Sequence, residues 1–358
     1  MCSIEGELPV PSYTIDTLRV LRERHPAASF RWVMGVDLLP QVDRWKEWPA
    51  IAGEFSPIVV GRGGHGQAAG SPTFPQIAST DIRRALARGE PETRMPQAVT
   101  DAVGRWFAPV PLARTTAFDG LLDVCHGFSG ADDGLGERLD LGWSEKSAHD
   151  RYHQDWVRTL ATLAERARLS QVVMAEQVHG GAVIVNPSPN GVHRFVGAGD
   201  GLVTTVEDVI LTIRTADCVP VLFASPKGLA AAHAGWRGVA ANVCRQTVEA
   251  LCMATGETAS DVRAVIGPHI SSQAYEVGEE VVQGIAATGV PEDLFTTREG
   301  GTIRVDLLAA VRGQLQMAGL HEVEVVEGCT YSDTGLHSYR RDGEAAGRQV
   351  AMIARLSS

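Results

Sequence analysis

Three residues that lie far apart in the chain, His179, Cys218 and His233, carry side chains that could together bind a metal ion. Cys218 precedes the apolar run Val219–Ala224 and His233 follows the apolar run Leu229–Ala232, so two strands would bring a thiol and an imidazole to one point. His179 follows a third apolar run and adds a second imidazole. Two histidines and one thiolate suit zinc and leave a fourth position for water or substrate. Spacing alone favours a simpler interpretation, a core cysteine and two hydrogen-bonded histidines.

Other polar residues near these three could take part in catalysis. Asp217 could act as an acid or base or accept a hydrogen bond within the site, and it could equally stabilise the turn that follows it. Arg237 and Arg340 could bind an anion, although arginines near acids more often form surface ion pairs. His269 could face the pocket, although a hydrogen-bonded loop histidine is the favoured interpretation, and His126 has a modest claim to the site. The predicted catalytic residues are Cys218, Asp217 and His233, and the predicted phosphate-binding residues are Arg237 and Arg340.

Composition limits the class of protein. A chain of 358 residues with 44% hydrophobic and 21% charged residues is typical of a globular protein with two domains. The net charge of -11 argues against nucleic acid as a partner. The first 30 residues lack a secretory pattern and no apolar run could span a membrane, so we expect a cytoplasmic protein whose six cysteines are reduced. The sequence leaves open whether it is a monomer or a homodimer.

Apolar patterns predict strands that alternate with helices, and hence an α/β fold. The proline pair Pro109 and Pro111 is the expected linker, which places a domain boundary near residue 110. Strands are predicted at Pro57–Arg62, Val124–Gly130, Val172–Ala175, Val219–Ala224, Leu229–Ala232, Val262–Ile266 and Glu322–Val326, and helices at Leu38–Trp48, Ser147–Arg168, Val239–Met253, Glu276–Ile285 and Leu307–Met317.

Residues 1–108 contain the strings SYTIDTLR, VVGRGG and STDIR, and they resemble the C-terminal part of a nicotinate-nucleotide adenylyltransferase. The resemblance implies a partial Rossmann-like nucleotidyltransferase domain, with Trp45 near the nicotinate ring and Ser79, Thr80 and Arg83 near the ATP phosphates. The Gly-x-Phe-x-Pro-x-His-x-Gly-His loop that opens this family is missing. We therefore expect no adenylyltransferase activity, whether the start of the chain lies upstream or the segment is a relic.

Residues 110–358 contain, in order, QVHG, GDGLVTT, TADCVPVLF, AAAHAGWRG, IGPHI…YEV, CT and SYRRDG…GR. These motifs are similar to those of the family known variously as polyphenol oxidase, laccase-domain protein and purine nucleoside phosphorylase. The resemblance implies an α/β sandwich and a zinc ion held by His179, Cys218 and His233, the set proposed above from ligand chemistry. It also implies phosphorolysis of adenosine, inosine, guanosine and methylthioadenosine and hydrolytic deamination of adenosine. Purine nucleosides and phosphate are thus the expected partners.

One segment departs from the family pattern. The family usually has Phe-Thr-Thr-Arg-x-Gly-Gly where this chain has FSGADDG at Phe128–Gly134, so an arginine is replaced by a small residue with acids beside it. If that arginine binds phosphate, another cation must do so here, and Arg138, Arg237 and Arg340 are the candidates. Near the C-terminus, Leu336 and His337 stand where the family tends to have an aromatic pair.

Three alternative functions remain open at the level of sequence. A metal-free cysteine hydrolase would use Cys218 as nucleophile and His233 as base. A copper-dependent phenol oxidase agrees with the family's older name, although a multicopper centre needs more histidines than gather around these motifs. A non-enzymatic metal-binding scaffold would leave nucleosides unchanged.

Overall fold

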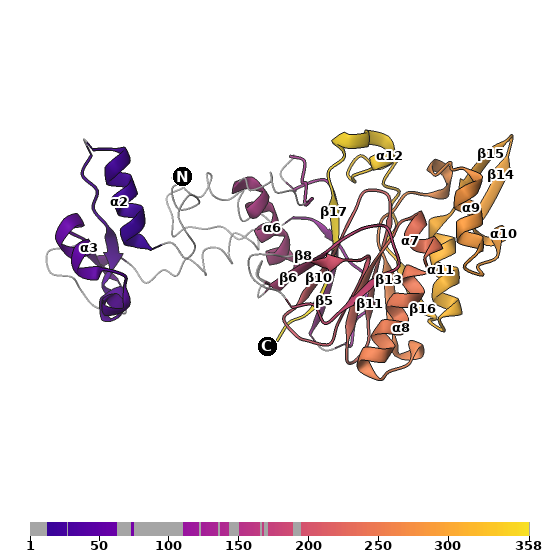
Figure 1. Ribbon diagram of the computed structural model, residues 1–358, viewed down its shortest axis with the longest axis horizontal. Coiled ribbons are helices and arrows are strands. Elements are labelled where there is room, and N and C mark those ends of the chain that lie inside the picture. Colours follow the sequence, from indigo (N-terminus) through magenta and orange to yellow (C-terminus); the bar gives the residue numbers. More distant parts are fainter. Residues whose placement is uncertain are drawn as a thin grey trace. The chain divides into compact units, whose positions relative to one another are not determined.

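The computed structural model describes residues 13–26, 28–62, 73–74, 110–121, 123–134, 137–142, 150–164, 167, 171–188 and 195–357. The chain divides into two units, Met1–Arg83 and Arg84–Ser358, and each is described by itself (Figure 1). The predicted residues Ser79, Thr80, Arg83 and Pro109 lie outside the described residues, so their roles and the boundary near residue 110 stay predictions.

The first unit is a small parallel sheet with helices. Strands β1 (Val33–Gly35), β2 (Ile58–Arg62) and β3 (Thr73–Phe74) pair in that order and in parallel, as the alternating pattern predicts. Helices α2 (Thr14–Arg24) and α3 (Trp48–Phe55) bury Ile15, Leu18, Ile51 and Phe55 in one cluster. Trp45 lines a pocket of about 240 Å³ together with Tyr13, Thr14, Arg44, Lys46 and Ile51.

The second unit contains two six-stranded sheets. The first sheet has the order β4-β5-β17-β10-β6-β8 and the second has the order β16-β13-β11-β12-β9-β7. The strands of the first sheet are β4 (Leu112–Ala113), β5 (Val124–Ser129), β6 (Val172–Glu176), β8 (Phe195–Ala198), β10 (Ile210–Thr215) and β17 (Gln349–Arg355). Those of the second sheet are β7 (Val183–Val185), β9 (Gly201–Thr204), β11 (Val219–Ala224), β12 (Leu229–Ala234), β13 (Arg263–Ile266) and β16 (Glu322–Val325), and β14 (Thr296–Glu299) and β15 (Thr302–Val305) form a separate hairpin.

Helices cover the outer face of each sheet, so the second unit has four layers. Helix α6 (Asp150–Leu163) packs on the first sheet through Trp156, Leu160 and Leu163. The second sheet is covered from the other side, as Figure 1 shows, by α7 (Trp236–Ala240), α8 (Val243–Thr255), α9 (Glu279–Ala286) and α11 (Leu307–Met317). Short helices complete the unit: η4 (Ala259–Asp261), η5 (Ser272–Ala274), α10 (Glu292–Phe295), α12 (Tyr339–Asp342) and η6 (Gly343–Ala345).

The central strands β11 and β12 are buried along their whole length. Val221, Phe223 and Ala232 face the helical layer, whereas Leu222 and Ala231 face the other sheet. A strand covered on both faces needs a continuous apolar run instead of an alternating one. This is why both runs could be identified as strands from the sequence.

Two predicted helices differ from those observed. The segment predicted as a helix at Leu38–Trp48 is a 3-10 helix, η1 (Val36–Arg44), with Pro40 inside it, because proline removes a helical N–H donor. The helix predicted at Val239–Met253 is divided between α7 and α8, because Asn242 has a left-handed backbone with φ 59°. Among the described residues, no helix has the length and apolar character needed to cross a membrane.

Candidate metal centre

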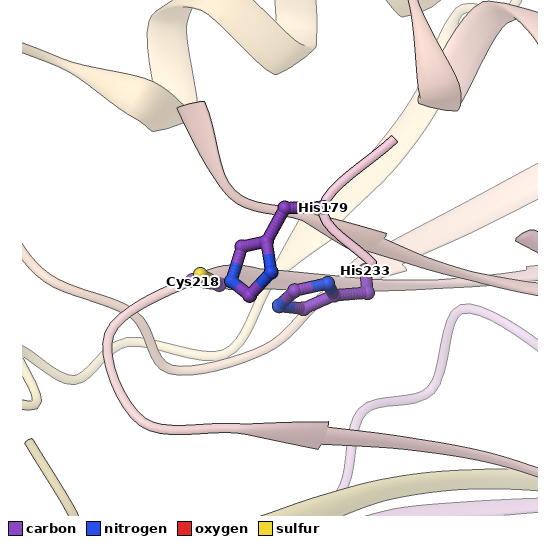
Figure 2. A group of neighbouring side chains, drawn as sticks. All are labelled: His179, Cys218 and His233. Atoms are coloured by element: carbon purple, nitrogen blue, oxygen red, sulfur yellow. The ribbon is translucent and has the colours of Figure 1, made fainter. Parts of the chain in front are cut away.

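His179, Cys218 and His233 lie together at one end of the two sheets (Figure 2). Their ligand atoms all lie within 4.8 Å of one another, and the two imidazole rings are 4.8 Å apart at 79°. Tetrahedral zinc with two nitrogens and one sulfur needs ligand atoms roughly 3.3–3.6 Å apart, so the three side chains are close to the required arrangement. Among the described residues, no other set of three or more His, Cys, Asp or Glu side chains could share an ion.

Strand register brings Cys218 and His233 together. Val219 pairs with Ala234 and Pro220 pairs with His233 in the antiparallel β11–β12 ladder, which leaves Cys218 opposite Gly235. A Cβ atom on Gly235 would lie 2.8 Å from the Cys218 sulfur and 3.1 Å from Cδ2 of His179. Glycine is therefore required here so that the chain can pass directly behind two ligands.

A side-chain clamp holds the segment that carries His179. Gln177, just after β6, donates to the Arg214 carbonyl (2.8 Å) and accepts from the Arg214 amide (3.0 Å), so its amide extends the pairing with β10. His179 itself has φ 59°, a left-handed conformation that is uncommon for residues other than glycine. Strained backbone of this kind is often found at functional sites.

Asp200, a completely buried residue, connects the two histidines. Its Oδ1 accepts a hydrogen bond from Nδ1 of His233 at 2.7 Å and from the backbone amide of His179 at 3.0 Å. Its Oδ2 accepts from the amides of Gly180 (2.7 Å) and Val178 (3.2 Å). With Nδ1 of His233 bound to Asp200, Nε2 is the ring atom that can bind a metal. Sequence reasoning interpreted Asp200 only as part of a tight turn, although its place in the GDGLVTT motif could have identified it.

Electrostatics favour a thiolate at this site. Burial raises the pKa of the Cys218 thiol, but the charge of His233 and hydrogen bonds from His179 and His233 outweigh burial and lower that pKa to about 6. Burial lowers the pKa of His233, but the Cys218 charge and the hydrogen bond to Asp200 raise it to about 9. The carboxyl of Asp200 has a lowered pKa, because its hydrogen bonds to His233 and to backbone amides outweigh its burial. Deprotonated sulfur is the form that binds metals.

Asp217 lies next to Cys218, but its carboxylate is directed to another loop. Its Oδ1 accepts from the Thr330 hydroxyl at 2.6 Å, and its Oδ2 accepts from the Arg340 amide at 2.6 Å. The residue is buried and has φ 97°. These hydrogen bonds connect the segment before Cys218 to the start of helix α12.

Each of the two predicted anion-binding arginines lies over an aromatic ring. The guanidinium of Arg340 lies 5.1 Å from the centre of the Tyr275 ring, and that of Arg237 lies 4.4 Å from the centre of the Trp236 ring. Burial raises the pKa of the Tyr275 phenol, which also lies within the electrostatic influence of Cys218, Asp217 and both arginines. The structure therefore places Tyr275 among the predicted site residues. From the sequence alone, Tyr275 is identifiable only as part of the IGPHI…YEV motif.

The segment that departs from the family pattern has a structural explanation. Asp133 is buried, and its Oδ2 lies 3.2 Å from Nη1 of the buried Arg158. Arg138, a third candidate for phosphate binding, pairs with Asp342 at 3.2 Å and contacts Nδ1 of His337 at 3.2 Å. Asp133 thus has a cationic partner, and Arg138 is engaged with the C-terminal loop.

The remaining candidate residues lie outside the metal group. His126 is buried, accepts from the Thr115 amide at 3.3 Å, and has a pKa lowered to about 4 by burial and by Arg114. His269 contacts the Gly267 carbonyl through Nδ1 at 2.8 Å, and burial lowers its pKa. The other described cysteines, Cys125, Cys244, Cys252 and Cys329, are all free thiols.

Comparison with known families gives an independent view of the chain. The sequence model of the family described as "Multi-copper polyphenol oxidoreductase laccase" matches residues 127–356. The match contains all three candidate ligands as well as Asp200 and Arg340. It leaves residues 1–126 outside, so the resemblance of residues 1–108 to nucleotidyltransferases stays a prediction.

Relatives and solved structures agree with this match. Purine nucleoside phosphorylase of Deinococcus radiodurans is 38% identical over 179 residues, which are 49% of this chain and 67% of that protein. Purine nucleoside phosphorylase YlmD of Geobacillus stearothermophilus is 36% identical over 200 residues, 52% of this chain and 73% of that protein. The crystal structure of the same YlmD has a TM-score of 0.59 and 28% identity over 70% of this chain and all of that chain. The Bacillus licheniformis hypothetical protein YfiH has a TM-score of 0.60 and 27% identity over 69% of this chain and 99% of that chain, and the two structures together confirm the mixed α/β fold.

Proposed function

Because this chain belongs to the family described as multi-copper polyphenol oxidoreductase laccase, and because relatives named purine nucleoside phosphorylase match it, we propose that it is a zinc-dependent purine nucleoside enzyme. Its reactions would be phosphorolysis of adenosine, inosine, guanosine or methylthioadenosine, and deamination of adenosine. The convergence of two imidazoles and a low-pKa thiol on one point supports this proposal most directly.

The donor set favours zinc over other ions. Sulfur with two imidazole nitrogens suits a borderline-soft cation, whereas magnesium and calcium prefer oxygen ligands. Three protein ligands leave a fourth position open, the arrangement of catalytic zinc sites. When bound, zinc would lower the pKa of a coordinated water to about 7 and so supply a hydroxide nucleophile at neutral pH.

The residues around the metal group would have separate tasks. In deamination, the water oxygen forms a bond to C6 of adenine and the C6–N6 bond breaks to release ammonia. In phosphorolysis, a phosphate oxygen forms a bond to C1′ while the C1′–N9 bond breaks, and the departing purine must gain a proton. Arg237 and Arg340 would bind the phosphate, because both are exposed cations and both lie close enough to Tyr275 to influence its pKa.

The direct test is chromatography of adenosine after incubation with the zinc-loaded protein, with and without phosphate. Phosphate-dependent formation of adenine and ribose 1-phosphate would support phosphorolysis, and inosine would support deamination. Unchanged nucleosides under all conditions would refute the enzyme proposal and leave the metal-binding scaffold.

Two cysteine variants provide a matched comparison. Cys218→Ala should abolish both activities and reduce bound zinc to background. Cys252→Ala removes a partly buried thiol that packs against the core, and it should retain both activities and the bound zinc. Elemental analysis of the same samples identifies the metal, and stoichiometric copper with oxidation of a phenol would favour the oxidase instead.

A metal-free cysteine hydrolase is the second candidate, and one observation favours it. Cys218 has a low pKa, and His233 is held through Nδ1 by Asp200, as in a nucleophile–base–carboxylate triad. However, Cys218 also receives a hydrogen bond from His179, a second imidazole that a triad does not need. Hydrolase activity that survives chelation and is lost on alkylation would establish this alternative.

A further inference from the structure

Asp217 holds the backbone of Arg340 in place. One carboxylate oxygen accepts from the Arg340 amide at 2.6 Å and the other from the Thr330 hydroxyl at 2.6 Å. The Asp217 carbonyl accepts from the amide of Ile270 at 3.0 Å. Because Asp217 is covalently joined to Cys218, these contacts fix the start of helix α12 next to the metal group.

The side chain of Arg340 is oriented by two further contacts. Its guanidinium carbon lies 5.1 Å from the centre of the Tyr275 ring, and its Nη1 donates to the Glu276 carbonyl at 2.9 Å. Among the described residues, this is the one hydrogen bond that its side chain makes. A guanidinium carries five N–H donors in a planar fork, so several donors are left to bind an anion.

The neighbouring Arg341, unlike Arg340, uses most of its side-chain donors in hydrogen bonds within the protein. Arg341 donates to the carbonyls of Thr330 (2.7 Å), Tyr331 (3.1 Å), Asp333 (3.1 Å) and Leu336 (2.8 Å), and it also pairs with Asp342. Its donors are consumed in organising the loop that precedes α12. Of the two adjacent arginines, Arg340 is therefore the one whose donors can bind a ligand.

We propose that Asp217 and Tyr275 are positioning residues that hold Arg340 beside the metal group, where its guanidinium binds the phosphate. The identity of the anion rests on the proposed function. Asp217 is then not the acid or base of the reaction, because both of its oxygens already accept hydrogen bonds within the protein. Tyr275 acts through the face of its ring, which attracts the cation, and not through its hydroxyl.

The test compares four variants of the full-length, metal-loaded protein. Inorganic phosphate is titrated by calorimetry, and phosphate KM, nucleoside KM and the pH profile of kcat are measured for the same samples. Tyr275→Phe keeps the ring and should change phosphate affinity less than about twofold, whereas Tyr275→Leu should weaken it about tenfold. Asp217→Asn should also weaken phosphate binding about tenfold, because a neutral amide oxygen replaces the charged acceptor of the Arg340 N–H and holds it less firmly. Tyr339→Phe removes a hydroxyl on helix α12 that donates to Glu344 at 2.9 Å, and it should match wild type.

Several outcomes would overturn this assignment. Loss of one limb of the pH profile in Asp217→Asn with unchanged phosphate affinity would make Asp217 an acid or base. Equal defects in Tyr275→Phe and Tyr275→Leu would assign the role to the hydroxyl. Unaltered phosphate binding in Tyr275→Leu would remove Tyr275 from the site, even if Asp217→Asn failed to fold. The calorimetric titration needs no turnover, so it decides whether Asp217 and Tyr275 support phosphate binding even if the nucleoside reactions are absent.

Discussion

Replacing Asp200 by asparagine should weaken metal binding ~10- to 100-fold, the usual effect of removing a hydrogen-bonding partner of a ligand histidine. The wild-type carboxylate accepts from Nδ1 of His233 and from the three amides of residues 178–180. Asparagine keeps one acceptor oxygen, so its NH₂ must face N–H donors on the other side. If the oxygen stays on His233, two backbone donors lose their partner, at about 1–3 kcal/mol each.

The assay is competition for zinc against a chromophoric chelator, combined with thermal unfolding of the metal-free protein. Asp261→Asn is the matched control, because Asp261 is an exposed capping residue hydrogen-bonded to Thr258. We expect this control to lose helix-cap stability only and to keep its zinc affinity. An Asp200→Asn protein with wild-type zinc affinity and unchanged unfolding temperature would refute the role assigned to Asp200.

Three more results are expected. Gly235→Ala should reduce zinc content, since the new Cβ would lie 2.8 Å from the Cys218 sulfur, and elemental analysis of the purified variant checks this. The pKa of His126 is lowered to about 4, so its protonation favours the unfolded chain: this contribution to stability is complete above about pH 6.5 and is lost as the pH falls towards 4. His126→Gln should therefore show a smaller drop in unfolding temperature across that window than wild type, and an equal drop would contradict the explanation. Removing the metal with a chelator should lower the unfolding temperature, and adding back zinc should restore it.

The sequence predicted that His179, Cys218 and His233 lie together because these residues follow strong local patterns. Cys218 and His233 adjoin apolar runs that are too short for helices and are bounded by turn residues, and both runs are strands with nearly the predicted bounds. The α/β fold followed from the same alternation. The register of β11 against β12 brings Cys218 and His233 together, and the sequence alone did not specify this register.

Contacts between distant segments were harder to predict. Asp200 lies between two glycines, and this context is typical of a tight turn, so its hydrogen bonds to His179 and His233 are apparent only in three dimensions. Asp217 is similar, since its partners Thr330 and Arg340 are more than 100 residues away in the sequence. Neither periodicity nor composition contains information on such pairs.

The three candidate metal ligands come from both sheets. His179 follows β6 of the first sheet, whereas Cys218 and His233 belong to the β11–β12 hairpin of the second. An ion at this point would crosslink the two sheets at their edge. Metal binding would then be coupled to closure of the two sheets at this edge. The metal-free protein should therefore open locally at this edge more often and be cut there by proteases.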